Sequence, residues 1–386
     1  MKKRHFIFIG IILLTIILNI LAWHSTAFCD AYIAYVFPLW VNTYGRITGL
    51  FPFSVGEWLI VAGVVLVVAA LVLSVTVVPA AVLHLQRWKV FLKRFYAFFA
   101  WTLVVVCLVM TLNCFILYHA STFSEKYYGK DTGEYTLEEL IQVRNAVVEQ
   151  CNRLSGEVER YEDGTVRYTG SLSEDGRAID MEDKARETMQ QLGQSYPQLD
   201  GWYPRPKAMF FSDFMCQQYM LGYYFPFSME ANYNHVAEVL NQPAGMCHEL
   251  AHLRGYIYED EANFISYLAC IQSDDIYFQY SGYLSVLPYL ENDLYYAKRD
   301  SASAYEQAVT AVPLLPVERI VWEDDEFVSD EEWERINGKA LLDTETVDEM
   351  SDAFVDTTLK VNGVSDGKVS YSRVVRLMLQ YYRLRD

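Results

Sequence analysis

Apolar residues are concentrated in three long runs near the start of the chain. The runs cover about residues 6–23, 59–83 and 95–118. Each approaches the roughly 20 residues that a helix needs to cross the hydrocarbon core of a bilayer. Three such runs with almost no charge are not typical of buried helices in a soluble protein. The pattern therefore predicts a membrane anchor with three transmembrane helices over 1–119, followed by one domain over 120–386.

Beyond the anchor, the pattern predicts a mainly α domain with a small β component. Aromatic-rich 207–211 and 223–233 are typical of short strands, and polar, glycine-punctuated 151–180 predicts a loop or hairpin. Helical spacing, with Thr136 as a candidate N-cap, predicts helices in the following ranges: 120–150, 182–192, 243–253, 259–273, 301–312, 331–342, 347–359 and 370–384.

Basic residues near the apolar runs predict the orientation of the anchor. They form two groups, at residues 2–4 and in the loop expected at 87–94. Segments rich in Lys and Arg stay in the cytoplasm, and three crossings place both groups on the same side. The N-terminus is therefore expected in the cytoplasm and 120–386 outside the cytoplasmic membrane. The first run can also be read as a signal peptide with small residues at 25–27, and either reading exports the C-terminal part.

Charge divides the chain at the same place. Residues 1–119 contain eight Lys/Arg and two Asp/Glu, a net charge of +6, whereas 120–386 contain 23 and 47, a net charge of −24. Phosphate groups repel so acidic a domain, which excludes nucleic acid as a partner and disfavours flat contact with anionic lipid. The expected partners are the bilayer, through the three helices, and a peptide or protein outside it.

The chemistry is concentrated in an HExxH motif formed by His248, Glu249 and His252. Residues four apart project from one face of a helix, so the two imidazoles can bind one Zn²⁺ while Glu249 acts as general base on a metal-activated water. The motif also arises by chance in roughly one in a hundred chains of this length, as two ordinary histidines beside a surface glutamate. Pro243 and Gly255, at the expected start and end of the helix, favour the metal site.

A third ligand is expected among the acidic residues after this helix. Glu259 is preferred, because Asn263 follows four residues later on the same helical face and can support a ligand histidine. Glu261 is the alternative if these residues still lie in the turn. An intramembrane protease is disfavoured, because the polar residues around the motif make its helix too short to span a bilayer.

Two further groups of residues have weaker signals. Glu230 and Asn232 precede the motif and are candidate substrate-binding residues on an edge strand, with a polar capping loop as the alternative. The seven cysteines show no spacing that dictates a disulfide pairing. For Cys247, packing within the helix is favoured over metal binding.

Several separated motifs resemble one known family. It is a bacterial family of membrane-anchored proteins catalogued as a domain of unknown function and regarded as zinc metallopeptidases. The motifs are residues 224–228 (YFPFS), 230–232 (EAN), 247–252 (CHELAH), 261–264 (EANF), 280–283 (YSGY), 359–362 (LKVN) and 370–375 (SYSRVV). The resemblance implies a zincin-like, gluzincin-type α+β domain in which His248 and His252 bind zinc, Glu249 is catalytic and a glutamate of the second motif completes the site. The segment 366–368 departs from the family pattern without touching this chemistry.

Three functions are consistent with these residues. The leading hypothesis is a zinc-dependent peptidase acting on exported or cell-surface proteins. The first alternative is a non-enzymatic sensor or binding module in which four protein ligands close the zinc site. The second is a zinc amidase acting on the cell wall, which lies on the same side of the membrane.

Overall fold

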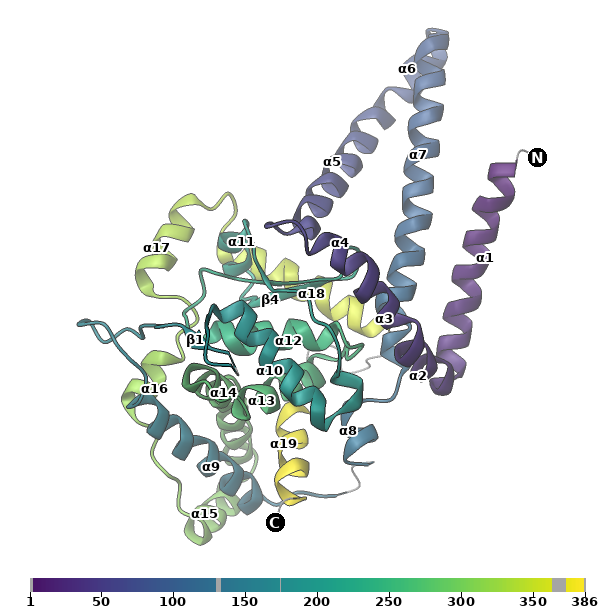
Figure 1. Cartoon of the computed structure of the whole chain (residues 1–386). Helices are drawn as coiled ribbons and strands as arrows, with labels where there is room; N and C mark the ends of the chain where they lie inside the picture. The colour runs from purple at the N-terminus through teal and green to yellow at the C-terminus, as the bar shows by residue number, and fades with distance from the viewer. Residues whose placement is uncertain (1–2, 130–132, 174, 363–372, 385–386) are drawn as a thin grey trace.

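Three long helices extend from a mainly helical body (Figure 1). The computed structural model describes residues 3–129, 133–173, 175–362 and 373–384. The long helices are α1 (Lys3–His24), α5 (Val55–Val75) and a third segment, Gln86–His119, made of α7 (Gln86–Met110), η2 (Thr111–Phe115) and η3 (Leu117–His119). Each is long and apolar enough to cross a bilayer. The three apolar helices predicted from the sequence are confirmed, and they make this a membrane protein.

The connection between the second and third long helices differs from the prediction. A short helix, α6 (Val77–Val82), precedes the turn, and α7 then begins at Gln86, about nine residues earlier than expected. The basic residues at 87–94 therefore lie on α7, not in a loop. A helix tolerates them beyond its apolar part because long Lys and Arg side chains keep their charges in water. These residues and the N-terminus of α1 lie at the end remote from the body (Figure 1).

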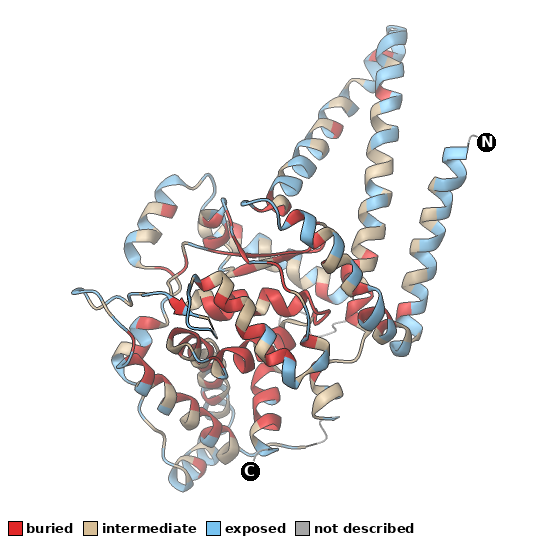
Figure 2. Ribbon diagram, viewed as in Figure 1, coloured by how far each residue is buried: buried red, intermediate tan, exposed pale blue. Residues whose placement is uncertain are grey.

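The segment between α1 and α5 packs into the core of the body. It consists of α2 (Thr26–Tyr35), α3 (Phe37–Trp40), η1 (Val41–Gly45) and α4 (Arg46–Thr48). Cys29, Phe37 and Val41 are almost completely buried and belong to the main hydrophobic cluster. The long helices, by contrast, are largely exposed, whereas buried residues gather at the centre of the body (Figure 2).

Four helices form the centre of the body: α9 (Leu137–Ser155), α12 (Asn241–His252), α13 (Glu259–Ile271) and α14 (Ile276–Asp300). Thr136 caps α9, because its hydroxyl accepts from Glu139 N while the Glu139 carboxylate accepts from Thr136 N. The sequence did not predict α14, which contains Pro288. A proline inside a helix costs about 3 kcal/mol, and this helix offsets that cost by burying a full face against its neighbours.

The remaining helices surround this centre and confirm the mainly helical prediction. They are α8 (Phe123–Tyr127), α10 (Met181–Ser195), η4 (Pro197–Leu199), α11 (Ser212–Cys216), α15 (Ala302–Ala311), α16 (Arg319–Asp324), α17 (Asp330–Lys339), α18 (Thr344–Val361) and α19 (Val374–Arg383). Residues 370–372, which begin the last predicted helix and the last family motif, lie outside the described residues, as does 366–368.

Two small sheets supply the β component. β1 (Ser171–Leu172) and β2 (Ala178–Ile179) form an antiparallel pair within the predicted hairpin region. β3 (Lys207–Ala208), β4 (Gly222–Phe225) and β5 (Glu230–Tyr233) form a sheet in the order β3-β5-β4. β5 pairs in parallel with β3 and antiparallel with β4. The prediction that 230–232 forms an edge strand is therefore wrong, because β5 has a neighbour on each side.

Candidate functional site

The helix α12 and the loop that follows it position the residues of the HExxH motif. Pro243 lies in the first turn of α12, and the helix ends at His252, close to the predicted bounds. Gly255 then takes a φ of +88°, which reverses the chain. A β-carbon at this glycine would lie 2.8 Å from a methyl group of Ile33, so the close packing also requires glycine. This turn brings the N-terminus of α13 against the end of α12.

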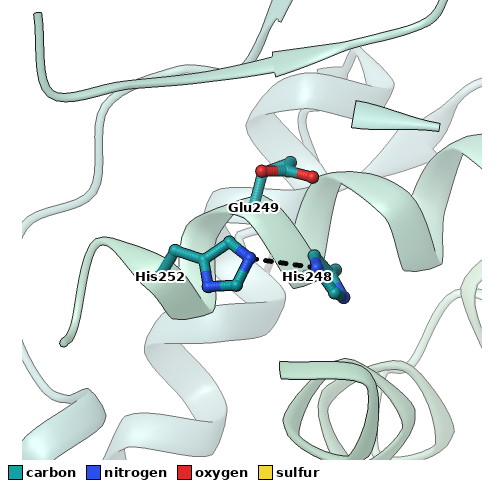
Figure 3. A group of neighbouring side chains, drawn as sticks. All are labelled: His248, Glu249 and His252. Carbon is teal, nitrogen blue, oxygen red and sulfur yellow. Dashed lines mark hydrogen bonds between the residues drawn. The ribbon is translucent and has the colours of Figure 1, made fainter. Parts of the chain in front are cut away.

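The two histidines of the motif face each other from adjacent turns of α12 (Figure 3). Their Nε2 atoms are 3.0 Å apart, and the ring planes are nearly perpendicular, at 87°. His252 Nδ1 lies 2.7 Å from the carbonyl oxygen of Tyr256, and His248 Nδ1 lies 2.7 Å from Asn263 Oδ1. A carbonyl only accepts hydrogen bonds, so Nδ1 of His252 carries the proton. In the neutral ring, its Nε2 then presents a lone pair towards His248.

Glu259, the first residue of α13, approaches the same point. Its Oε2 atom is 2.9 Å from His248 Nε2 and 3.9 Å from His252 Nε2. Glu261 points elsewhere, since its carboxylate accepts hydrogen bonds from the backbone N and the hydroxyl of Ser124. Of the two glutamates considered as third ligands, the structure brings only Glu259 to the histidines.

The donor atoms fit a tetrahedral zinc ion. Zinc binds His nitrogen and carboxylate oxygen at about 2.0–2.2 Å, which in a tetrahedron separates the ligand atoms by roughly 3.3 Å. The three separations among His248 Nε2, His252 Nε2 and Glu259 Oε2 are 3.0, 2.9 and 3.9 Å. Each histidine also has its second nitrogen held by an oxygen acceptor, the arrangement that orients ligand histidines in metal sites. Two imidazoles and a carboxylate match the borderline-soft character of Zn²⁺.

Glu249 lies on the other side of the motif, beside β4. A nitrogen of each histidine and a carboxylate oxygen of Glu249 all lie within 4.8 Å of one another. The side chain is buried, accepts a hydrogen bond from Tyr224 N, and leaves Oε2 without a partner among the described residues. Gly222 leaves room for this carboxylate, since a β-carbon there would lie 2.6 Å from Glu249 Cγ. A buried carboxylate oxygen without a donor is ready to accept a proton or a hydrogen bond.

Burial and mutual electrostatic interactions shift the pKa values of the two histidines, Glu249 and Glu259. Burial raises the pKa of Glu249 to about 8, and the charge of Glu259 adds to this effect. Burial lowers the pKa of His252 to about 4. Burial also acts to lower the pKa of His248, but the hydrogen bond and charge of Glu259 outweigh it and raise that pKa to about 9. A divalent cation among these groups favours carboxylates and neutral imidazoles, so its binding releases protons.

Glu230 and Asn232, the residues predicted to bind substrate, are both buried and hydrogen-bonded within the body. Glu230 forms a buried ion pair with Lys207 and accepts hydrogen bonds from Val55 N and Gly56 N, and the Asn232 amide donates to Tyr223 O. Both side chains are about 1% exposed. The structure therefore corrects the prediction that they bind substrate, because they are enclosed within the sheet.

Cys247 is also enclosed, and its thiol is hydrogen-bonded to that of Cys270 on α13. Three residues of the site were not predicted from the sequence: Gly222 and Tyr224 beside Glu249, and Tyr256, whose carbonyl oxygen contacts His252. The YFPFS motif of 224–228 was a signal for Tyr224 alone, and it did not reveal that β4 borders the site.

A family model described as "Protein of unknown function (DUF3810)" matches residues 32–379, which include the second and third long helices, the small sheet and the histidine site. No curated protein and no solved structure matches the chain. Because the match covers nine-tenths of the sequence, the chain belongs to this family of unknown function, DUF3810.

Proposed function

We propose that this protein is a zinc-dependent metallopeptidase anchored in the cytoplasmic membrane, with its body on the outer side. One observation carries the proposal: two Nε2 atoms and a carboxylate oxygen converge within 4 Å while the Nδ1 of each histidine is held by an oxygen. Without a metal ion, a proton on His248 relieves the repulsion between these acceptor atoms, in line with its raised pKa; a divalent cation would serve all three atoms at once. The basic residues at the remote ends of α1 and α7 support the orientation.

The residues around the site have separable roles in peptide hydrolysis. His248, His252 and Glu259 would hold the ion, which supplies Lewis acidity and a water of lowered pKa. Glu249 accepts the proton of the attacking water and returns it to the leaving amine. Asn263 orients His248 through Nδ1.

Among the described residues β4 has a neighbouring strand on one side only, and its other edge is suited to bind an extended peptide. Asn234 N donates to Leu221 O, so Leu221 belongs to a hydrogen-bonded pair of the β4–β5 ladder. In an antiparallel ladder, hydrogen-bonded and non-hydrogen-bonded pairs alternate along the strand. The backbone groups of Gly222 and Tyr224 consequently point away from β5, and Tyr224 N reaches Glu249. A substrate paired along this edge would present its backbone beside the carboxylate. A site helix, a flanking edge strand and a ligand from the next helix support a gluzincin-type fold as part of the proposal.

The decisive test separates metal binding from catalysis. The full chain, purified in detergent, is analysed for bound zinc and for cleavage of an unfolded-protein and peptide library. We expect wild type to bind one zinc ion and to cleave, Glu249→Gln to keep zinc without cleaving, and Glu259→Gln to lose zinc. Glu261→Gln is the matched control and keeps zinc, because Glu261 faces Ser124.

Two outcomes would favour the alternatives. If Glu249→Gln abolishes zinc binding, Glu249 is a fourth ligand and the site is a closed structural one, as in a sensor or binding module. If zinc is bound but only purified cell-wall material is cleaved, the protein is an amidase. A folded wild-type chain that binds no zinc under zinc-replete conditions would refute the proposal.

A further inference from the structure

Exposed aromatic side chains gather where the body meets the second long helix. Phe210, Phe211 and Phe214 are 75%, 40% and 52% exposed, and the rings of the first two are in contact. We call these three residues the aromatic segment; they lie just before and within α11. The loop that leads into α5 adds Phe51 and Phe53, which are 45% and 46% exposed. Exposed apolar groups that lie together mark an interaction surface.

The aromatic segment is attached directly to the start of α5. The Glu57 carboxylate accepts hydrogen bonds from the backbone N of Phe210 and of Phe211, both at 2.9 Å. Lys207, three residues before Phe210, donates to the carbonyl oxygen of Phe53 at 3.0 Å. Figure 1 shows α11 beside the base of α5. The height of the aromatic segment along the membrane normal is therefore set by α5.

That height corresponds to the boundary of the hydrocarbon core. Glu57 lies in the first turn of α5, two residues before Leu59, where the long apolar run begins. Two residues of helix span about 3 Å. The 21 residues of α5 are just enough to cross a hydrocarbon core of about 30 Å, so its first turn lies at the headgroup region. Aromatic side chains are favoured at this depth.

We propose that the aromatic segment inserts into the leaflet that faces the body and docks the body on the lipid. Contact through aromatic rings suits this body, because its net charge of −24 excludes attraction to anionic headgroups. The surface is continuous with the membrane-embedded face of α5, which favours lipid over a second copy or another protein as its occupant. This inference is independent of the proposed peptidase activity.

The test measures the depth of a fluorescent label in the full chain. Phe210→Cys is labelled with nitrobenzoxadiazole in a Cys107→Ser background, because the other six cysteines are buried. The chain is reconstituted into phosphatidylcholine vesicles at low protein density, with and without lipid carrying a doxyl quencher. Tyr295→Cys is the control: Tyr295 is 64% exposed on α14, whose C-terminal part leads to α15 at the end of the body away from the long helices (Figure 1). Phe214→Cys provides a second position.

We expect blue-shifted emission and several-fold stronger lipid quenching at 210 and 214 than at 295, with no change at high salt. Equal quenching at 210, 214 and 295 would overturn the proposal. Blue-shifted emission at 210 without lipid quenching would also overturn it, because a protein surface, and not lipid, would then cover the segment.

Discussion

Replacing Gly222 with alanine tests whether Glu249 acts from the position that the structure gives it. The new β-carbon would lie 2.6 Å from both Cγ and Oε1 of Glu249 and 2.9 Å from the carbonyl oxygen of Asn232. Ordinary contacts of this kind begin at 3.4 Å, so the carboxylate must move by about 0.8 Å. The φ of Gly222 is not in the left-handed region, so alanine adds no φ strain there, but the contact with Asn232 O also requires a small shift of the strand.

A displacement of this size should reduce hydrolysis without removing the metal. A shift of about 1 Å in a reacting group costs on the order of 100-fold in rate, or about 2.7 kcal/mol in the activation free energy. We expect kcat and kcat/KM of Gly222→Ala to fall together by about that factor. Zinc content should be unchanged, since the three atoms nearest the new methyl group belong to Glu249 and Asn232 and not to a histidine. Crowding should also lower the free energy of unfolding by about 1–3 kcal/mol.

The matched control is Gly245→Ala on α12, three residues before His248. Its β-carbon would lie 3.4 Å from Leu221 Cβ, an ordinary contact, and alanine in a helix stabilises by about 0.5–1 kcal/mol relative to glycine. This variant should keep wild-type activity and zinc. The assay is steady-state cleavage of a peptide selected from the library, with zinc content measured on the same samples. Full activity in a folded Gly222→Ala protein would refute the role given to Glu249.

Three further predictions concern metal affinity, a buried ion pair and pH. Asn263→Ala should weaken zinc binding by about 10–100-fold in a competition titration, because His248 loses the acceptor that orients it. Lys207→Met should lower the free energy of unfolding by about 3–5 kcal/mol in denaturant titrations, because Glu230 is left buried without its cation. Burial raises the pKa of Asp325 to about 7, so the folded state binds the extra proton between about pH 4 and 7 and stability falls as pH rises through this window. Between pH 5 and pH 8, the free energy of unfolding of Asp325→Asn should therefore fall less than that of wild type, by on the order of 2 kcal/mol. Thermal unfolding of both proteins at pH 5 and at pH 8 measures this difference.

Each of these has a control or a contrary result. Asn145→Ala is the control for Asn263→Ala. It removes an exposed hydrogen bond from the Asn145 amide to the carbonyl oxygen of Pro313, and zinc affinity should not change. The double variant Lys207→Met/Glu230→Gln should be more stable than Lys207→Met alone, and equal stability would show that the charge of Glu230 is not the cause. If wild type and Asp325→Asn lose stability equally between pH 5 and 8, another group titrates in that range.

Local sequence signals predicted most single elements and failed where tertiary packing decides. The run lengths predicted three apolar helices, and Thr136 marked the start of α9, because hydropathy and capping depend on neighbours in the sequence. Pro288 and a tyrosine-rich composition concealed α14, which forms because its neighbours bury it. Strand order was also beyond local reasoning: a pattern of aromatic residues does not reveal that β5 lies between β3 and β4.

For the candidate site, the sequence by itself determined that His248 and His252 share a helix face, because residues four apart on a helix always do. It left Glu259 and Glu261 as alternatives, because the choice depends on where α13 begins relative to α12. The tertiary structure decided this through the turn at Gly255, which brings Glu259 to the histidines and directs Glu261 to Ser124. Contacts between distant segments, such as β4 against Glu249, depend on how the chain packs in three dimensions, and no spacing along the sequence encodes them.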